Sequence, residues 1–337
     1  MDVDDTISDN CALALLVRYH VRMLFIVGGL GFIGTHAARE FADHGEQVAV
    51  STHRTIRDTK VSEELFQGRV TVVSLDMTDG AAVAATFDRL GVDSVCNLLA
   101  PPPGAWEVGE EYRANMIGLL NILEAAQKRG VRRLTQASSA AVYAQLPPGA
   151  HDEDAPLPMN GRNSTEAFKK AEEVLAGHFA DRTGLDMAIV RFSGIYGPLY
   201  HSLVNFPSRV AHAAVKGRPL PLERDGQPLV YAGDGGDMCC VKDAVLGLRL
   251  IHNAPKLQHR VYNVASGVPT TNADVAGAAH AAQPSFSLQL PPGSRGGSGG
   301  VGYSSIARIQ SDLGYAPHHT IGSGMAEYMS WLASHEE

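Results

Sequence analysis

A short apolar run that breaks into regularly spaced glycines is the feature that most constrains the fold of this chain. Four apolar residues lead into Gly28, and Gly31 and Gly34 follow at three-residue spacing. A helical pattern over Thr35–Asp43 comes next, and then a second apolar run, Val48–Val50. This order predicts a strand, a tight turn, a helix and a second strand, which is the unit that opens a dinucleotide-binding domain.

Each glycine of this turn has its own physical task. Gly28 lets the chain turn out of the strand, Gly31 lets the backbone approach a pyrophosphate, and Gly34 lets the helix pack close to the sheet. The diphosphate would sit at the helix N-terminus, near Phe32 and Ile33, where unpaired N–H groups and the helix dipole favour negative charge.

The composition is typical of a globular enzyme and limits the kinds of partner that we expect. The chain has 337 residues, 45% of them hydrophobic, with a formal net charge of −8 that argues against a nucleic-acid binder. Neither the four cysteines nor the fourteen histidines show metal-ligand spacing, and we expect no metal. No apolar run is long enough to cross a membrane, and a reducing, cytoplasmic location is expected.

Strand and helix patterns alternate along most of the chain. Strands are expected at Val70–Leu75, Ser94–Ala100, Leu134–Ala137, Met187–Arg191 and Val261–Val264, and helices at Ala81–Leu90, Glu107–Arg129 and Glu166–Asp181. This alternation predicts a Rossmann-like, doubly wound α/β fold with a parallel sheet. We expect an N-terminal extension over 1–22, a dinucleotide-binding domain over 23–195 with returning segments at about 228–265, and a substrate-binding lobe from 196–227 and 266–337.

Several separate motifs, in one order along the chain, resemble those of the extended short-chain dehydrogenases/reductases, the NAD-dependent epimerase/dehydratase group. The matching residues are Gly28, Gly31 and Gly34; Asp76-Met77; Asn97-Leu98-Leu99-Ala100; Asn115; Ser138-Ser139-Ala140-Ala141-Val142-Tyr143; Arg191 to Pro198; Asp237 to Asp243; and Tyr262-Asn263-Val264. The resemblance covers nearly the whole chain, from about Met23 to Leu332.

The resemblance implies roles for some of these residues. Asp76 and Met77 would contact the adenine, while Leu98, Leu99, Ala100 and Asn115 would border the cofactor. Ser139 would bind the reacting oxygen, and Tyr143 and Ser193 would line the substrate pocket.

A first departure from the family pattern concerns the nucleotide. NAD-specific members place an acid at the tip of the second strand, but this chain has Thr52, His53 and Arg54 there. An acid would repel a 2′-phosphate, whereas Arg54, with Arg57 or His53, could pair with one. NADP is therefore favoured and NAD stays possible; the alternative is that these are solvated loop charges.

The second departure concerns the catalytic pair. In the family a Tyr-x-x-x-Lys pair opens the second long helix, and here the lysine falls on Lys169 while the tyrosine position holds Thr165. A threonine hydroxyl is a poor proton donor or acceptor near neutral pH. A register shifted by one, with Glu166 four residues before Lys170, restores no tyrosine.

The group that moves the proton stays open at this stage. Lys169 itself, with a pKa depressed by burial, could act as the acid or base. The other candidates are Tyr143, Tyr196, Glu166, Ser164 and a hydroxyl of the substrate.

A third departure concerns the substrate. Gly194 stands where sugar-nucleotide members commonly carry an asparagine that contacts the substrate diphosphate. This lowers the expectation of a nucleotide-sugar substrate without excluding it.

Two functions follow as hypotheses. The first is an NAD(P)-dependent oxidoreductase or epimerase/dehydratase that acts on a hydroxyl or keto carbon of a sugar-like, polyol or natural-product substrate. The second is a non-redox isomerase or cyclase, or a nucleotide-binding regulator, on the same fold, because the catalytic tyrosine is absent. The family likeness also implies a homodimer through helices 107–129 and 166–181.

Overall fold

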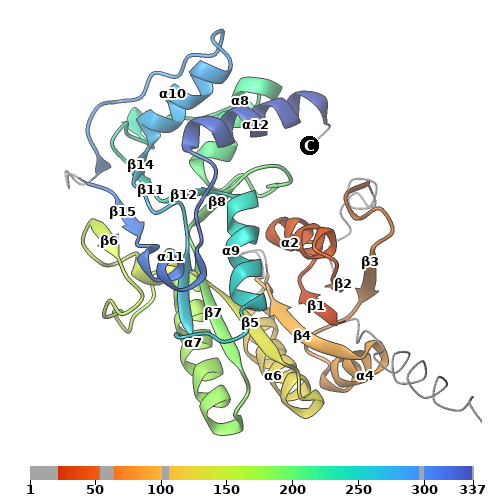
Figure 1. Cartoon of the computed structure of the whole chain (residues 1–337). Helices are drawn as coiled ribbons and strands as arrows, with labels where there is room; N and C mark the ends of the chain where they lie inside the picture. The colour runs from red at the N-terminus through yellow and green to blue at the C-terminus, as the bar shows by residue number, and fades with distance from the viewer. Residues whose placement is uncertain (1–21, 54–63, 101–105, 296–299, 336–337) are drawn as a thin grey trace, which may run out of the picture.

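The structure, a computed structural model, describes residues 22–53, 64–100, 106–295 and 300–335. Its centre is a parallel sheet of seven strands in the order β13-β7-β5-β4-β1-β2-β3 (Figure 1). The strands are β1 (Met23–Val27), β2 (Gln47–Thr52), β3 (Val70–Ser74), β4 (Val92–Asn97), β5 (Arg133–Ser139), β7 (Met187–Phe192) and β13 (Val261–Val264). The predicted doubly wound, Rossmann-like α/β fold is confirmed. Of the predicted N-terminal extension, residues 1–21 lie outside the described residues.

The direction of winding changes beside β1. Phe25 in β1 pairs with Ala49 in β2 on one side and with Val95 in β4 on the other. The chain runs from β1 outward to β2 and β3, and then crosses back to β4 and outward the other way. Because all these strands are parallel, their carboxyl ends share one edge, and the loops after β1 and β4 diverge there to form a crevice.

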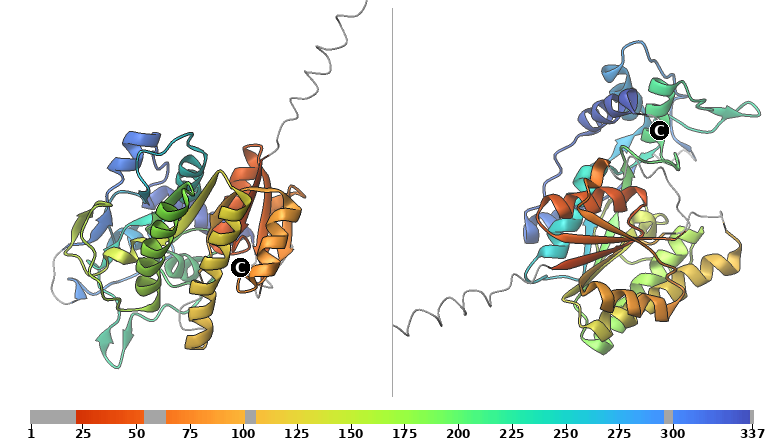
Figure 2. Two further views of the ribbon diagram at one scale, coloured as in Figure 1. Left: turned by 90° about the horizontal axis from the view of Figure 1, so that it is seen from below. Right: turned by 90° about the vertical axis from the view of Figure 1, so that its right-hand side faces the viewer.

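Helices cover both faces of the sheet. Helices α2 (Phe32–Asp43) and α9 (Val241–Asn253) pack together on one face, and α4 (Gly80–Leu90), α6 (Gly118–Arg129) and α7 (Ser164–Thr183) lie on the other (Figure 2). A sheet covered on both faces needs strands that are apolar throughout, which explains the short continuous apolar runs in the sequence.

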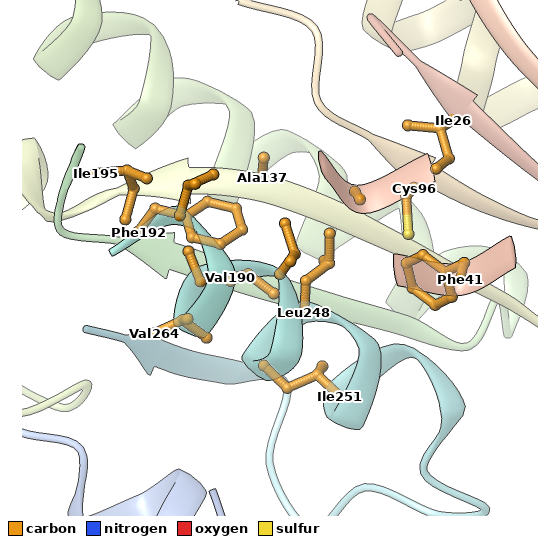
Figure 3. Packing of buried hydrophobic residues seen from close by; sticks show 14 of the residues in the cluster. Ile26, Phe41, Cys96, Ala137, Val190, Phe192, Ile195, Leu248, Ile251 and Val264 are labelled. Carbon is orange, nitrogen blue, oxygen red and sulfur yellow. The ribbon is translucent and has the colours of Figure 1, made fainter. Parts of the chain in front are cut away.

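Alternating side chains of each strand enter different cores. Ile26 of β1 packs with Phe41 of α2 and Leu248 of α9, a cluster shown in Figure 3. Phe25 and Val27, its neighbours in the strand, enter the cluster on the opposite face. This two-residue alternation is the geometry of a pleated strand, and it locks β1 in the middle of the fold.

A smaller, mostly helical group of elements follows the sheet. Helices α8 (Phe206–Lys216), α10 (Asn272–Ala282) and α12 (Ile321–Ser334) share a third apolar cluster. Short strands among the described residues form four separate two-stranded sheets. They pair β8 (Gly194–Tyr196) with β12 (Met238–Cys240), β11 (Gly235–Gly236) with β14 (Thr270–Thr271), β6 (Gly149–His151) with β15 (Gly302–Ser304), and β9 (Glu223–Arg224) with β10 (Gln227–Pro228). Helix α11 (Ala307–Leu313) contacts β13 and α9. The boundaries expected for a substrate-binding lobe stay a prediction.

Two elements differ from the sequence expectation. The strand expected to reach Ala100 ends at Asn97, because the Asn97 Oδ1 accepts a hydrogen bond from the Leu99 backbone N–H at 3.1 Å and turns the chain. The helix expected without a break over 107–129 consists of α5 (Val108–Tyr112), a π-helical turn η1 (Arg113–Ile117) and α6. Within η1, Asn115 Nδ2 donates to the carbonyl of Glu111 at 2.8 Å and so competes with the regular helical ladder.

The glycine turn is as crowded as its sequence suggests. Gly28 has a φ of +74°, in the left-handed region. A Cβ added to Gly34 would lie 2.4 Å from the Gly28 carbonyl oxygen and 2.7 Å from the Gly29 Cα. Both obstacles are backbone atoms, so they cannot rotate away.

We expect Gly34→Ala to destabilise the protein by about 3 kcal/mol, since overpacking against backbone forces α2 away from the turn. Gly277→Ala is the matched control, because Gly277 is an exposed residue inside α10 where an added Cβ would meet no atom within 4 Å. That change should leave stability unchanged or raise it by up to about 1 kcal/mol. Urea unfolding of both variants checks the prediction, and equal midpoints would contradict it.

Candidate active site

A cavity of about 320 Å³ opens where the winding changes direction, at the carboxyl ends of β1 to β4. Nine of the residues expected to contact the cofactor line it: Gly28, Gly31, Thr52, His53, Asp76, Met77, Leu98, Leu99 and Ala100. They follow four different strands, and only the parallel sheet brings them together.

The start of α2 fits a diphosphate. The helix begins after Gly31, which has no side chain with which to cap it, and its first turn carries no acid. Its first N–H groups therefore keep the capacity to bind an anion. Phe32, Ile33 and Gly34 form this first turn; they do not line the cavity, so backbone N–H groups are what they can contribute.

A carboxylate and a histidine lie together in the wall of this cavity. Asp76 Oδ1 accepts hydrogen bonds from the backbone N–H of Thr78 at 2.9 Å and from its hydroxyl at 2.8 Å. The Nε2 of His53 lies 3.5 Å from the other oxygen of Asp76. Arg54 and Arg57, the cations expected near a 2′-phosphate, lie outside the described residues.

Sequence reasoning missed one wall of the cavity. Trp106, Glu110 and Arg113 line it from α5 and the residues next to it. No local motif marks these positions, because only the tertiary structure brings them to the cavity that Gly28 and Gly31 also line. Asn115, which was expected to border the cofactor, is buried and does not line the cavity.

Lys169 is the lysine of α7 that reaches the cavity wall. Its side chain is buried, and its Nζ donates to Glu172 Oε2 at 2.8 Å and to the Leu99 carbonyl at 3.4 Å. Lys170 turns away and donates to the carbonyl of Asn160 at 2.8 Å. Thr165, one turn before Lys169, is half-buried.

A second buried ion pair fixes α7 to the sheet. Arg191 of β7 binds both oxygens of Glu173, with N–O distances of 2.9 and 2.6 Å. The hydroxyl of Ser138 in β5 donates to Glu173 at 2.5 Å. Because charge-assisted, two-pronged bonds are directional, this network holds the register of α7, and with it Lys169, against the ends of β5 and β7.

The two tyrosines considered as proton donors are held in the interior. The Tyr143 hydroxyl accepts from Arg191 Nη1 at 2.7 Å and donates to Asn263 Oδ1 at 2.9 Å. Burial raises the pKa of Tyr143, and it also raises the pKa of Tyr196, which is 1% exposed. Both phenols are better suited to packing and hydrogen bonding than to proton exchange near neutral pH.

Glu166 and Ser164 lie at the start of α7. Burial alone would raise the pKa of Glu166, but hydrogen bonds from Lys170, Gln145 and the Arg162 backbone lower it to about 2. Glu166 is therefore ionised at neutral pH and cannot donate a proton. The Ser164 hydroxyl contacts Glu111 Oε2 at 3.4 Å.

A second cavity, of about 460 Å³, lies beyond Ser139. Three of the residues expected at the substrate line it, Tyr143, Ser193 and Gly194, together with rings such as His151. Ser139 ends β5, and its oxygen accepts the backbone N–H of Ala141 at 3.1 Å, which leaves the hydroxyl hydrogen to donate elsewhere.

Asp237 also lines the second cavity. Its carboxyl group accepts hydrogen bonds from the backbone N–H groups of Ser266, Gly267 and Ser304 and from the Ser266 hydroxyl. Burial raises the pKa of Asp237, against these hydrogen bonds. These hydrogen bonds join the segments at Ser266–Gly267 and Ser304, so the carboxyl group of Asp237 has a structural role.

Two features of the described residues bear on the expected partners. Within them, no three His, Cys, Asp or Glu side chains are grouped so as to hold a metal ion. Of the helices described, none combines the length and the apolar character needed to span a membrane.

Comparison with protein families identifies the chain. Residues 24–265 match the model of the NAD dependent epimerase/dehydratase family. The chain belongs to this family. Epimerase/dehydratase relatives include the dTDP-glucose 4,6-dehydratase of Streptomyces griseus, 30% identical over 66% of this chain and 65% of that protein. The GDP-mannose 3,5-epimerase 1 of Oryza sativa subsp. japonica is 30% identical over 51% of this chain, and the aligned part covers 46% of that protein.

Solved epimerase/dehydratase structures share the fold over nearly the whole chain. The Thermotoga maritima UDP-glucose 4-epimerase with UDP-glucose superposes with a TM-score of 0.79 at 19% identity, covering 93% of this chain and 99% of that one. MoeE5 in complex with UDP-glucuronic acid and NAD gives a TM-score of 0.74 at 25% identity, covering 92% and 99%. Members of this family are enzymes, and structural neighbours bind NAD and small sugar nucleotides.

Proposed function

We propose that this chain is a nicotinamide-dinucleotide-dependent enzyme of the epimerase/dehydratase type. It acts on a hydroxyl or keto carbon of a sugar-like, polyol or natural-product substrate. The observation that carries the proposal is the cavity at the change of winding, where the glycine turn, the open N-terminus of α2 and Asp76 meet the loop that Lys169 contacts.

Different residues bind the cofactor and the substrate. The N–H groups at the start of α2 bind the diphosphate, and Asp76 binds the adenine end. The nicotinamide, when bound, supplies hydride transfer. Lys169 holds the ribose, and the Ser139 hydroxyl donates a hydrogen bond to the reacting oxygen of the substrate, which stabilises negative charge as it develops there.

The second cavity supports a hydroxylated substrate with a flat or ring-shaped body. His151 and Tyr143 pack in its wall with ring centroids 5.3 Å apart. At Gly194, an added Cβ would lie 2.9 Å from both the Asp237 carbonyl oxygen and the Met238 Sδ. A side chain that could contact a diphosphate from this position therefore does not fit, which favours substrates without a nucleotide.

The competing function keeps the nucleotide and omits the redox step. A non-redox isomerase or cyclase, or a nucleotide-binding regulator, needs no tyrosine beside Lys169. The half-buried Thr165 on α7 is the observation that favours this alternative.

Lys169→Met separates the enzyme from a regulator. We expect it to lower turnover by about 10²-fold or more, because the proposed ribose contact and the ammonium that donates to the Leu99 carbonyl in the cavity wall are lost. Lys170→Met is the matched control, since Lys170 donates to Glu166 and to loop carbonyls away from the cavity, and it should keep turnover. Dinucleotide reduction followed at 340 nm with a panel of sugars and polyols provides the measurement. Equal activity of the two variants would contradict the assignment.

Thr165→Tyr then distinguishes a redox from a non-redox enzyme. A tyrosine four residues before Lys169 restores a phenol that can pass a proton, so hydride transfer should rise if the wild type is a dehydrogenase with an impaired acid–base step. No gain in hydride transfer, in a variant that still binds the dinucleotide, favours the non-redox function.

We propose NADP as the preferred cofactor, with NAD as the alternative. The tip of β2 carries Thr52 and His53 followed by Arg54, with no acid to repel a 2′-phosphate. A protonated histidine and an arginine can both pair with a phosphate. Solved relatives bind NAD, so the distinction depends on this segment.

Calorimetric titration of the purified protein with NADP⁺ and NAD⁺ tests the cofactor preference. We expect NADP⁺ to bind about ten-fold more tightly or better, which corresponds to about 1.4 kcal/mol. Arg54→Ala and His53→Ala should remove the preference and leave NAD⁺ binding nearly unchanged. Tighter binding of NAD⁺ by the wild type would disprove the preference.

We also propose a homodimer formed through α5, η1, α6 and α7. Large apolar side chains are exposed along these helices: Val108 (68%), Tyr112 (57%), Leu120 (47%), Val174 (69%) and Leu175 (52%). The rings of Tyr112 and Phe168 pack 4.9 Å apart, which joins α5 to α7 in one surface. An apolar patch that spans several helices is typical of a protein interface.

Leu120→Glu with Val174→Glu should convert a dimer into a monomer, because two desolvated carboxylates per subunit oppose the association. Met159→Glu is the control, since Met159 is 96% exposed in a loop outside these helices. Light scattering coupled to size-exclusion chromatography gives the mass. A wild-type monomer, or a dimer that survives both substitutions, would show that this surface is not the interface.

The proposed location is a reducing compartment such as the cytoplasm. Cys96, Cys239 and Cys240 are free thiols, and all three are buried. Buried thiols of this kind behave as small apolar core residues.

A further inference from the structure

Helix α7 carries two Lys–Glu ion pairs in neighbouring positions. Lys169 contacts Glu172 at 2.8 Å, and Lys170 contacts Glu166 at 2.8 Å. Both carboxylates are buried, with 3% exposure for Glu172 and none for Glu166. The pairs resemble each other in distance and burial, so their differences show what each can do.

The pair of Glu166 belongs to the start of the helix. Glu166 also accepts hydrogen bonds from Gln145 Nε2 at 2.5 Å and from the Arg162 backbone N–H at 3.0 Å. Lys170, the partner of Glu166, also donates to the carbonyl of Asn160. With three kinds of donor around it, this carboxylate stays ionised and ties the preceding loop to α7.

The pair of Glu172 lies beneath the dinucleotide cavity. Glu172 accepts hydrogen bonds from the Lys169 ammonium and from the Gln136 side-chain amide, and both donate to the same oxygen, Oε2. Gln136 Oε1 in turn accepts from Asn97 Nδ2 at 2.8 Å. Asn97 is the residue that ends β4 by accepting the Leu99 N–H, so the chain of contacts reaches the cavity wall.

Burial also acts differently on this carboxyl group. It raises the pKa of Glu172, while the Lys169 ammonium and the Gln136 amide only partly oppose the rise, and the neighbouring Glu173 carboxylate adds to it. Glu172 can therefore take up a proton at a pH where Glu166 stays charged.

We propose that Glu172 is a positioning residue that acts through Lys169: it stores a proton for Lys169, in place of the family's tyrosine. This proposal rests on the proposed function. The Thr165 hydroxyl does not ionise near neutral pH, whereas Lys169 and Glu172 are an acid and a base in direct contact, 2.8 Å apart.

The proposed proton transfer conserves the number of protons and the charge. One N–H bond of the Lys169 ammonium breaks and an O–H bond forms at Glu172 Oε2, which leaves a neutral amine beside a neutral carboxylic acid. The free electron pair on Nζ then takes the proton of a substrate hydroxyl, giving an alkoxide and an ammonium. The pair holds this extra proton and returns it when the substrate oxygen is protonated again, so no net proton is consumed over a full epimerase-type cycle.

The substitution Glu172→Gln keeps the shape of the side chain and removes the reservoir. We expect turnover to fall about 10²-fold and the pH dependence of kcat/KM to shift, because Lys169 can no longer pass its proton on. Glu166→Gln, at the matched ion pair, should lower stability but keep the wild-type pH dependence. Identical pH profiles for the two variants would overturn the proposal.

Infrared spectroscopy supplies a readout that needs no substrate or cofactor. The carbonyl band of buried, protonated carboxyl groups should titrate with pH in the wild type and in Glu166→Gln. In Glu172→Gln the Glu172 component of this band should be missing, while the component of Asp237, whose pKa burial also raises, remains. In Lys169→Met the Glu172 component should titrate at a higher pH, because the neighbouring ammonium that opposes protonation is gone. This variant keeps the test valid even if Glu172→Gln does not fold, and an unshifted band in Lys169→Met would overturn the proposal.

The experiments distinguish a failure of the proposed function from a failure of the proposed role of Glu172. Failure of the wild type to bind NADP⁺ or NAD⁺ refutes the proposed function. The band and its response to Lys169→Met still decide in that case whether Glu172 and Lys169 share a proton.

Discussion

The close approach of helix α2 to the turn after β1 is the constraint on which the rest of the molecule depends. With hydrogen in place of a side chain at Gly34, the helix lies against the backbone of Gly28 and Gly29, where a Cβ would come within 2.4 Å of a carbonyl oxygen. This approach packs Phe41 and its neighbours onto the central strand and orients the open N-terminus of α2 toward the cavity. The same contact thus stabilises the core and leaves the N–H groups of α2 open for the diphosphate that we propose binds there.

A layer of buried polar side chains joins α7 to the carboxyl ends of β4, β5 and β7. Glu173 is bound by Arg191 and Ser138, and Glu172 by Lys169 and Gln136. Buried charges are costly unless they are paired and hydrogen-bonded, and each of these carboxylates is both. Such a network gives precise placement more than net stability, and here it places Lys169 against Leu99 in the cavity wall.

Sequence reasoning predicted the parts of the fold whose signals are local. The glycine turn, the alternation of apolar runs with helical segments, and the motif positions from Asp76 to Lys169 each depend on neighbouring residues. The errors arose where a side chain interrupts the backbone: Asn97 ends β4 early, and the bond from Asn115 to the carbonyl of Glu111 accompanies a π-helical turn. Trp106 and Arg113 were missed because only the tertiary structure brings them to the cavity.

The sequence by itself determined the kind of binding site, because glycine spacing and strand order are local requirements of a dinucleotide turn. It also showed that a threonine stands where a tyrosine was expected. Only the tertiary structure decided which lysine of α7 contacts the cavity wall at Leu99 and which carboxylate pairs with it. Lys169 and Lys170 are adjacent in the chain, yet one is bound to Glu172 beneath the cavity and the other to Glu166 at the helix start. The direction of a side chain around a helix and the burial of its partner depend on packing with distant strands, which no local pattern specifies.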